Sequence, residues 1–463
     1  MSTSPYALLL RWEPENPEFW RHTGQRVAYR NLAISIPALM LAFSVWMLWS
    51  VVVVNLGRAG FDLSKNQLFW LTALPALSGA TLRVFYSFLV PIFGGRRWTA
   101  ISTASLLIPA VGMGFALRNP DTGYPVLLLL ALFCGLGGAN FSSSMSNISF
   151  FFPKVKKGFA TGLNAGIGNL GVSVVQFVVP MVIGVGVFGD LGGAPYIADG
   201  VDARPIWLQN AGFVWVLPIA IMSVAAWFGM NDIADAKASF AEQAVIFKRK
   251  HNWLMCWLYV GTFGSFIGFS AGFAMLTMAL FPDVDPLAYA FLGPLVGSLT
   301  RPLGGWVSDK IGGARVTMWT FICMALAVAA VMVFLPGPDR AGNFMGFLLT
   351  FILLFALSGL GNGSTFRMIP VIFLHERSAA VKGQGEAAQR QAVIDASRES
   401  AAVLGFSGAI GAYGGFFIPR SFGTSLAMTG EVHAALYSFI AFYVSCVLVT
   451  WWYYARRNAP VPC

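Results

Sequence analysis

The chain has 463 residues, of which 57% are hydrophobic and only 11% are charged, and its net charge is +10. Soluble domains carry charges on about a quarter of their residues, so this composition excludes an ordinary soluble protein. Apolar runs of membrane-spanning length recur along the whole chain, which indicates an all-α protein that crosses a membrane many times.

The apolar runs predict twelve membrane-spanning helices in two six-helix halves. In chain order we expect spans near residues 33–56, 67–93, 98–117, 125–152, 158–188, 211–230, 252–280, 286–308, 315–335, 343–374, 401–427 and 433–455. The first tail shows no signal-peptide pattern, because its short apolar run is followed by acids and prolines.

These spans define the predicted domain organisation. We expect an N-terminal tail (1–32), a six-helix bundle (33–230), a polar connector (231–251), a second six-helix bundle (252–455) and a C-terminal tail (456–463). A polar stretch rich in Ala, Gln and Glu, residues 375–400, separates spans ten and eleven, and we expect it to be partly helical at the cytoplasmic surface.

Lys and Arg are distributed unevenly between the two sides of the predicted membrane. The two tails and the even-numbered loops carry 21 of the 30, whereas the odd-numbered loops carry 6. By the positive-inside rule both tails are cytoplasmic and the protein lies in the cytoplasmic (inner) membrane. Because this topology accounts for the net positive charge, we predict no nucleic-acid partner.

Three arginines, Arg83, Arg301 and Arg367, lie inside predicted spans, whereas all 20 acids are expected in tails, loops or span ends. An arginine at a helix centre costs about 2.5–3.5 kcal/mol on insertion scales. Arg83 and Arg301 each precede a Gly-Gly break by 11 residues, about 16 Å along a helix, which places both near the midplane. Arg367 lies nearer the cytoplasmic end of its span, and we interpret it as a snorkelling side chain.

Two internal repeats relate the halves. At one constant offset, Gly79, Arg83, Gly94, Gly95, Arg97 and Thr99 correspond to Gly297, Arg301, Gly312, Gly313, Arg315 and Thr317. At another, GLNAGIGNLG (162–171) matches GFSGAIGAYG (405–414). Guanidinium groups bind planar oxyanions through paired hydrogen bonds. Two arginines at matched depth therefore indicate an anion-binding site at the midplane of a transporter built from parallel six-helix repeats.

The glycines of the second repeat have two possible roles, close helix packing and space for a small ligand, and the residues leave this choice open. They are Gly162, Gly166, Gly168 and Gly171 in span five and Gly405, Gly408, Gly411, Gly414 and Gly415 in span eleven. The five cysteines and four histidines show no metal or redox spacing, so no metal and no cofactor are predicted.

The chain resembles the NarK-type nitrate/nitrite porters of the major facilitator superfamily. The resemblance covers nearly all of it and rests on RNLAISIPALMLAFSVWMLWS, GGANFSSSMSNISFFFP, YVGTFGSFIGFSAGFAML and the two glycine-rich segments GLNAGIGNLGVS and GFSGAIGAYGGFFIP. The glycine-rich segments are similar to the family's two nitrate signatures, and GGWVSDKIGGAR (304–315) is similar to the superfamily's loop signature.

The resemblance implies a monomer that transports nitrate and nitrite by alternating access. It implies that Arg83 and Arg301 clamp the anion and that Phe141 and Phe263 sandwich it. It also implies that Asn169 and Tyr259 hydrogen-bond it and that Gly411 lies beside the site.

The titratable residues of the predicted spans bear on the transport mode. No acid or histidine is expected near the midplane, and arginines do not release their protons, so we predict nitrate/nitrite antiport. Proton symport and transport of another small anion remain alternatives. An enzyme is disfavoured because the spans hold no nucleophile, metal cluster or acid pair, and an anion sensor because only the 375–400 stretch could serve as an output element.

Overall fold

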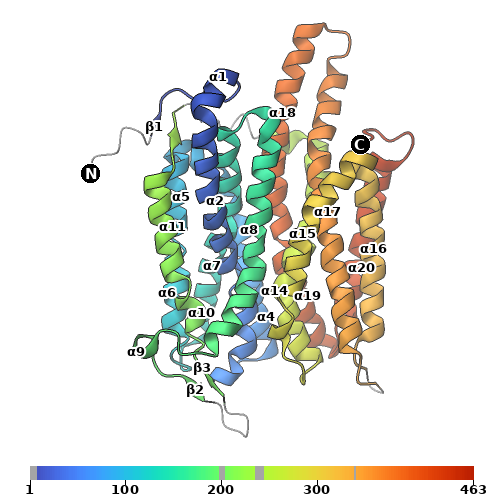
Figure 1. Cartoon of the computed structure of the whole chain (residues 1–463). Coiled ribbons are helices and arrows are strands. Elements are labelled where there is room, and N and C mark those ends of the chain that lie inside the picture. The colour runs from blue at the N-terminus through green and yellow to red at the C-terminus, as the bar shows by residue number, and fades with distance from the viewer. Residues whose placement is uncertain (1–7, 198–203, 235–244, 338–339) are drawn as a thin grey trace. The chain divides into compact units, whose positions relative to one another are not determined.

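The computed structural model describes residues 8–197, 204–234, 245–337 and 340–463, and helices dominate it (Figure 1). Within these residues, eleven helices are long and apolar enough to cross a membrane. The remaining predicted span, 286–308, is α15 (Leu292–Ile311), a 20-residue helix that carries Arg301, Asp309 and Lys310. The predicted polytopic all-α fold is confirmed.

The chain forms two compact units, one made of Met1–Lys237 and Ser270–Leu295, the other of Ala238–Phe269 and Val296–Cys463. We call them unit 1 and unit 2. The predicted halves place the whole of residues 252–280 in the second bundle, whereas here Ser270–Leu295 groups with unit 1. The chain therefore passes from unit 2 into unit 1 inside one helix, α14 (Ser265–Leu280).

Unit 1 is a bundle of long helices with short helical pieces at its ends. Its helices are α1 (Pro17–Phe19), η1 (Trp20–Gly24), α2 (Gln25–Trp46), α3 (Trp49–Val52), η2 (Val53–Asn55), η3 (Gly57–Ala59), α4 (Lys65–Phe93), α5 (Gly95–Ala104), α6 (Leu107–Ala116), α7 (Tyr124–Phe151), α8 (Lys154–Ile183), α9 (Gly189–Gly192), α10 (Asn210–Phe213), α11 (Val216–Gly229) and η6 (Pro286–Ala288), with α14 from Ser270 onward. Strand β1 (Leu8–Leu9) pairs in parallel with β4 (Asp232–Ile233), and β2 (Tyr196–Ile197) pairs antiparallel with β3 (Pro205–Ile206).

Unit 2 repeats this helical plan. Its elements are η4 (Val245–Lys248), α13 (Lys250–Tyr259), η5 (Val260–Gly264), the first turn of α14 up to Phe269, most of α15, α16 (Gly313–Phe334), α17 (Phe344–Ala380), α18 (Glu386–Ala412), α19 (Gly414–Thr429), α20 (His433–Thr450) and η7 (Trp451–Ala455). Figure 1 shows α17 and α18 running side by side beyond the neighbouring helices of this unit, at the end that also carries the C-terminus.

The polar stretch 375–400 is mostly helical. α17 continues to Ala380 and α18 begins at Glu386, so a short turn joins two helices of 37 and 27 residues. A 37-residue helix is about 55 Å long, whereas the hydrocarbon core is about 30 Å thick. The two helices therefore form a hairpin that extends out of the membrane.

Local sequence signals set the ends of the helix that carries Arg83. α4 starts with a reciprocal cap, in which Ser64 N donates to Gln67 Oε1 (2.9 Å) and Gln67 N donates to Ser64 Oγ (3.3 Å). It ends at Gly94, whose φ is +87°, and the equivalent Gly312 ends α15 with a φ of +94°. Glycine is the residue that adopts this conformation without strain, so the repeated Gly-Gly breaks of the sequence are the repeated ends of two equivalent helices.

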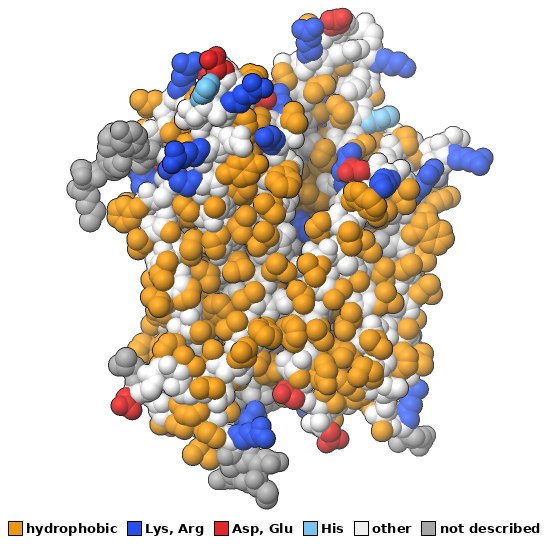
Figure 2. All heavy atoms as spheres, viewed as in Figure 1, with side chains coloured by type: hydrophobic (Ala, Val, Ile, Leu, Met, Phe, Trp, Pro, Cys, Tyr) orange, Lys and Arg blue, Asp and Glu red, His pale blue; other side chains and the backbone are white. Residues whose placement is uncertain are grey.

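Apolar side chains cover the flanks of unit 1 on the face that Figure 2 shows, and Lys and Arg gather at its end near the N-terminal segment. This distribution suits helices whose sides contact lipid. The N-terminal segment is packed onto that end. Its Trp20 lies in a buried apolar cluster with Ile148, Phe151 and Phe152, and Trp12 packs against the same cluster.

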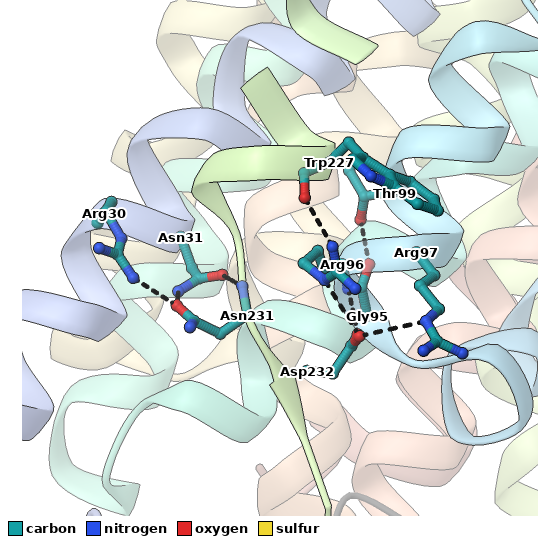
Figure 3. Close-up of polar contacts among 9 residues, drawn as sticks. All are labelled: Arg30, Asn31, Gly95, Arg96, Arg97, Thr99, Trp227, Asn231 and Asp232. Atoms are coloured by element: carbon teal, nitrogen blue, oxygen red, sulfur yellow. Dashed lines mark hydrogen bonds and ion pairs between the residues drawn. The ribbon is translucent and has the colours of Figure 1, made fainter. Parts of the chain in front are cut away.

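The start of the predicted connector is fastened to the same end of unit 1 (Figure 3). Arg96 is buried, and its backbone N and its Nε contact the two carboxylate oxygens of Asp232 at 2.8 and 3.3 Å. Arg96 Nη1 also donates to the carbonyl oxygen of Trp227 (2.7 Å). Asn231 Oδ1 accepts hydrogen bonds from Arg30 (2.7 Å) and Asn31 (3.0 Å). We call the Arg96–Asp232 contact and its neighbours the clasp.

Candidate anion-binding residues

Arg83 lies in α4, with none of its surface exposed. Its Nε donates a hydrogen bond of 2.7 Å to the carbonyl oxygen of Gly138 in α7. Its guanidinium carbon lies 4.8 Å from the ring centroid of Phe141 and 4.8 Å from that of Trp46. Both distances are within the about 6 Å over which cation–π attraction acts. The structure thus brings Arg83 and Phe141 together, as the resemblance implies, and adds Trp46 of α2.

Glycines make room for the Trp46 ring beside Arg83. Trp46 Nε1 donates a hydrogen bond of 2.8 Å to the carbonyl oxygen of Pro75, which fixes the indole. A Cβ atom at Gly79 would lie 2.8 Å from Trp46 Nε1, and one at Gly138 would lie 2.7 Å from the same atom. Contacts this short are not tolerated without movement, so glycine is needed at both positions.

Asn169, the predicted polar ligand of the first half, lies in α8 and is buried. Its amide oxygen has no hydrogen-bond partner among the residues that the structure describes. A buried polar group without a partner is costly. This oxygen can only accept a hydrogen bond, so it needs a donor, whereas an anion would have to accept a hydrogen bond from the Asn169 amide nitrogen.

Arg301 lies in α15 and is 7% exposed. Its Nη2 donates a hydrogen bond of 3.4 Å to the hydroxyl of Tyr259, and its guanidinium carbon lies 5.3 Å from the ring centroid of Phe366 in α17. Its Nη1 is buried with no acceptor in the described part of the chain. Arg301 and Tyr259 are therefore in contact, and one donor of this guanidinium is available to an anion.

Phe263 belongs to the same aromatic group. Its ring is stacked with that of Tyr259, with centroids 5.4 Å apart and planes 19° apart, and it also stacks with Phe266 at 6.4 Å. Phe263 lies in η5, a five-residue π-helical turn between α13 and α14. Such turns interrupt the regular helix and occur often at functional sites. Tyr259, at the last residue of α13, connects Phe263 to Arg301.

Comparison with known proteins assigns the chain to a family. Residues 34–389 match the Major Facilitator Superfamily. The chain is 55% identical to the nitrate/nitrite transporter NarU of Salmonella typhimurium, over 97% of each chain. It is 42% identical to the probable nitrate/nitrite antiporter NarK2 of Thermus thermophilus, over 98% of this chain and 97% of that one. The chain belongs to the NarK-type nitrate/nitrite porters of the major facilitator superfamily.

The fold agrees with this family. The crystal structure of a D-xylose-proton symporter superimposes with a TM-score of 0.67 at 15% sequence identity, and the match covers 94% of this chain and 98% of that one. The family and the relatives are transporters, which confirms the prediction that the chain is not an enzyme.

The glycines of the porter's two signature segments occupy matched positions, the first set in α8 and the second in α18 and the start of α19. Gly162 and Gly405 face open space, with no atom within 4 Å of a Cβ placed there, and Gly166 does the same. The other contacts also match between the two segments. A Cβ at Gly168 would lie 2.7 Å from Leu39 Cδ2, one at Gly411 would lie 2.7 Å from Tyr259 Cδ1, and Gly171 and Gly414 pack against the backbone of Met40 and Gly264.

Each signature helix of the porter therefore has an open side and a packed side. Gly408 and Gly415 are also buried. Gly411 is the member that contacts a candidate ligand-binding residue directly, because its missing side chain leaves room for the Tyr259 ring.

Arg367 has an acidic partner that was not predicted from the sequence. It forms an ion pair with Asp309, which lies in the last turn of α15. The side chain is 45% exposed, and Asp309 is a partner that the interpretation of Arg367 as a snorkelling side chain did not include. The predicted span ends at residue 308, one residue before this acid, whereas α15 continues to Ile311 and places Asp309 where α17 can reach it.

Two aromatic residues of the site were not predicted. Trp46 packs on Arg83, and Phe366 packs on Arg301. The sequence contains a signal for Phe366, because Gly138 and Phe141 in α7 have the same spacing as Gly363 and Phe366 in α17. Gly363 also packs against α15, because a Cβ placed on it would lie 2.1 Å from the carbonyl oxygen of Arg301. Within the described residues, no group of three or more His, Cys, Asp or Glu side chains could hold a metal ion.

Proposed function

We propose that this porter exchanges nitrate and nitrite across the cytoplasmic membrane, with both ends of the chain in the cytoplasm. Relatives whose names state nitrate/nitrite transport or antiport match it over nearly its whole length. The uneven distribution of Lys and Arg supports the orientation.

The observation that carries the proposal is the pair of equivalent arginines. Each is buried in its own unit, and each guanidinium lies against an aromatic ring that follows a glycine by three residues. Aromatic faces suit a flat, weakly hydrated anion, and guanidinium groups provide hydrogen bonds in the plane of its oxygens. We propose that Arg83 and Arg301 both bind the transported anion, with Asn169 and Tyr259 as polar ligands and Phe141 and Phe263 as apolar walls.

The permanent charge of arginine supports exchange. A proton symporter commonly has a titratable acid or histidine on its pathway, whereas Arg83 and Arg301 remain charged at every relevant pH. The two positive charges repel each other in the empty protein, and a bound anion lowers the net charge of the site. If only the anion-bound protein can switch the side to which its site is open, each nitrate that enters must be followed by a nitrite that leaves. The change itself is a rocking of the two six-helix halves.

Counter-flow into proteoliposomes tests this proposal. Vesicles are loaded with nitrite or with buffer alone, labelled nitrate is added outside, and uptake is followed together with an internal pH dye, with and without a proton gradient. We expect uptake that requires internal nitrite and leaves the internal pH unchanged. Uptake into empty vesicles that is driven by the gradient and acidifies the interior would show proton symport instead.

A further inference from the structure

Residues Ser270–Leu295 are separated from their sequence neighbours. The preceding part of span seven, α13 and η5, belongs to unit 2, and so does most of α15, which follows. The segment between them groups with unit 1. Side chains of α8 that contact this segment explain the grouping. We call Ser270–Leu295 the fastened segment.

Gln176 makes the central contact. It lies in α8, is buried, and its Nε2 donates hydrogen bonds to the carbonyl oxygen of Ser270 (2.8 Å) and to the hydroxyl of Ser50 in α3 (3.0 Å). One helical turn earlier, Ser173 Oγ donates a hydrogen bond of 3.0 Å to the carbonyl oxygen of Phe291. The ring of Phe177 meets that of Phe291 edge to face, with centroids 5.2 Å apart.

These contacts are costly to leave unmade. A buried amide in an apolar helix must find partners, and in a membrane few are available. Here both amide hydrogens of Gln176 are used, and one acceptor is the main chain of the fastened segment. The contacts lie in the second half of α8, at the last residue of the first signature segment and beyond it, and thus in the half of the helix that faces away from the cytoplasm in the proposed orientation.

We propose that Gln176 and Ser173 form an outer latch that holds Ser270–Leu295 against α8 while the outer side of the porter is closed. The latch must open for the anion to enter from that side, because the segment belongs by sequence to the second six-helix half. This inference rests on the proposed alternating access. Gln176 and Ser173 are positioning residues, which set how long the outer side stays closed and do not contact the anion.

Labelling of a cysteine tests the latch. Ser270→Cys places a thiol at a fully buried position and keeps the carbonyl that Gln176 contacts. In right-side-out vesicles, a membrane-impermeant maleimide reacts with it from outside only when the segment leaves α8. Labelling of the parent protein, which has native cysteines, gives the background. Each lost hydrogen bond shifts such an equilibrium about two- to tenfold, so adding Gln176→Leu is expected to raise the labelling rate at least about fivefold.

Gln209→Leu is the matched control. Gln209 is equally buried, and its Nε2 donates two hydrogen bonds of 3.0 Å to the carbonyl oxygens of Gly192 and Ala194, neither of which is in the fastened segment. Its removal should leave the labelling rate unchanged. If Gln176→Leu does not fold, Ser173→Ala can replace it, because this substitution removes only the hydroxyl group that donates to Phe291, and it should also raise the labelling rate.

The outcomes separate this inference from the proposed function. Unchanged labelling in both Gln176→Leu and Ser173→Ala, or an equal rise in Gln209→Leu, would overturn the latch. Protection of the same variants by nitrate against thermal unfolding reports anion binding independently. If nitrate protects the variants but their labelling is no faster, the latch is refuted and the proposed substrate stands. If labelling is faster but nitrate gives no protection, the latch stands and nitrate is refuted as the substrate.

Discussion

Arg83 and Arg301 occupy equivalent places in their helices but have different neighbours. Arg83 is bound to a main-chain carbonyl and lies between the rings of Trp46 and Phe141. Arg301 is bound to the Tyr259 hydroxyl and lies against Phe366. The hydrogen bond of the first guanidinium goes to the main chain, whereas that of the second goes to a tyrosine side chain. The glycine that gives this tyrosine its space is therefore a sensitive position.

Gly411→Ala is expected to reduce nitrate transport at least about tenfold. The new Cβ would lie 2.7 Å from Tyr259 Cδ1 and 3.1 Å from the Tyr259 carbonyl oxygen, so the tyrosine that contacts Arg301 must shift. Overpacking of this kind costs about 1–3 kcal/mol. Gly405→Ala, two helical turns away in α18, meets open space and should transport normally. Initial rates of labelled nitrate exchange measure both, and equal rates in the two variants would refute the role given to Gly411.

At the scale of elements, the equivalent ends of α4 and α15 have two different ion pairs nearby. Gly94 and Gly312 end the two helices with similar positive φ angles, +87° and +94°. After α4 the acid is Asp232, which comes from the far end of the first bundle, and its ion pair with Arg96 is buried, with side chains 6% and 10% exposed. At the end of α15 the acid is Asp309, and its ion pair with Arg367 is exposed, at 45% and 56%.

Asp232→Asn and Asp309→Asn should therefore differ in their effect on stability. Removing the charge of Asp232 leaves Arg96 buried without its carboxylate, which costs on the order of 3 kcal/mol. The exposed pair is worth about 0–1 kcal/mol, so Asp309→Asn should change little. Thermal unfolding of the purified proteins in one detergent compares them. A loss of stability in Asp309→Asn that equals or exceeds that in Asp232→Asn would contradict the clasp as a stabilising contact.

At the scale of the whole molecule, the sequence predicted those features of the fold that depend on amino-acid composition and on the spacing of residues. The glycine breaks at the ends of α4 and α15 and the matched signature segments follow from repeat offsets, and the midplane depth of Arg83 and Arg301 stays a prediction. Trp46 and Phe366 were not predicted, because the chain has 40 Phe and 15 Trp and hydropathy does not distinguish those that face a guanidinium. The grouping of Ser270–Leu295 with unit 1 was not predicted either, because it depends on contacts made by Gln176 and Ser173 in a distant part of the sequence.

Nitrate should stabilise the whole porter against thermal unfolding, and the stabilisation should require both arginines. A ligand at 100 times its Kd stabilises the folded state by about 2.7 kcal/mol. Lysine keeps the charge but loses the planar, paired hydrogen bonds of arginine, so Arg83→Lys and Arg301→Lys should fold but gain no stability from nitrate. Arg367→Lys, at an exposed ion pair, should keep the full effect. Protection that survives in Arg83→Lys or Arg301→Lys would show that this arginine does not bind the anion, and protection of the parent protein by acetate but not nitrate would indicate a different anion as substrate.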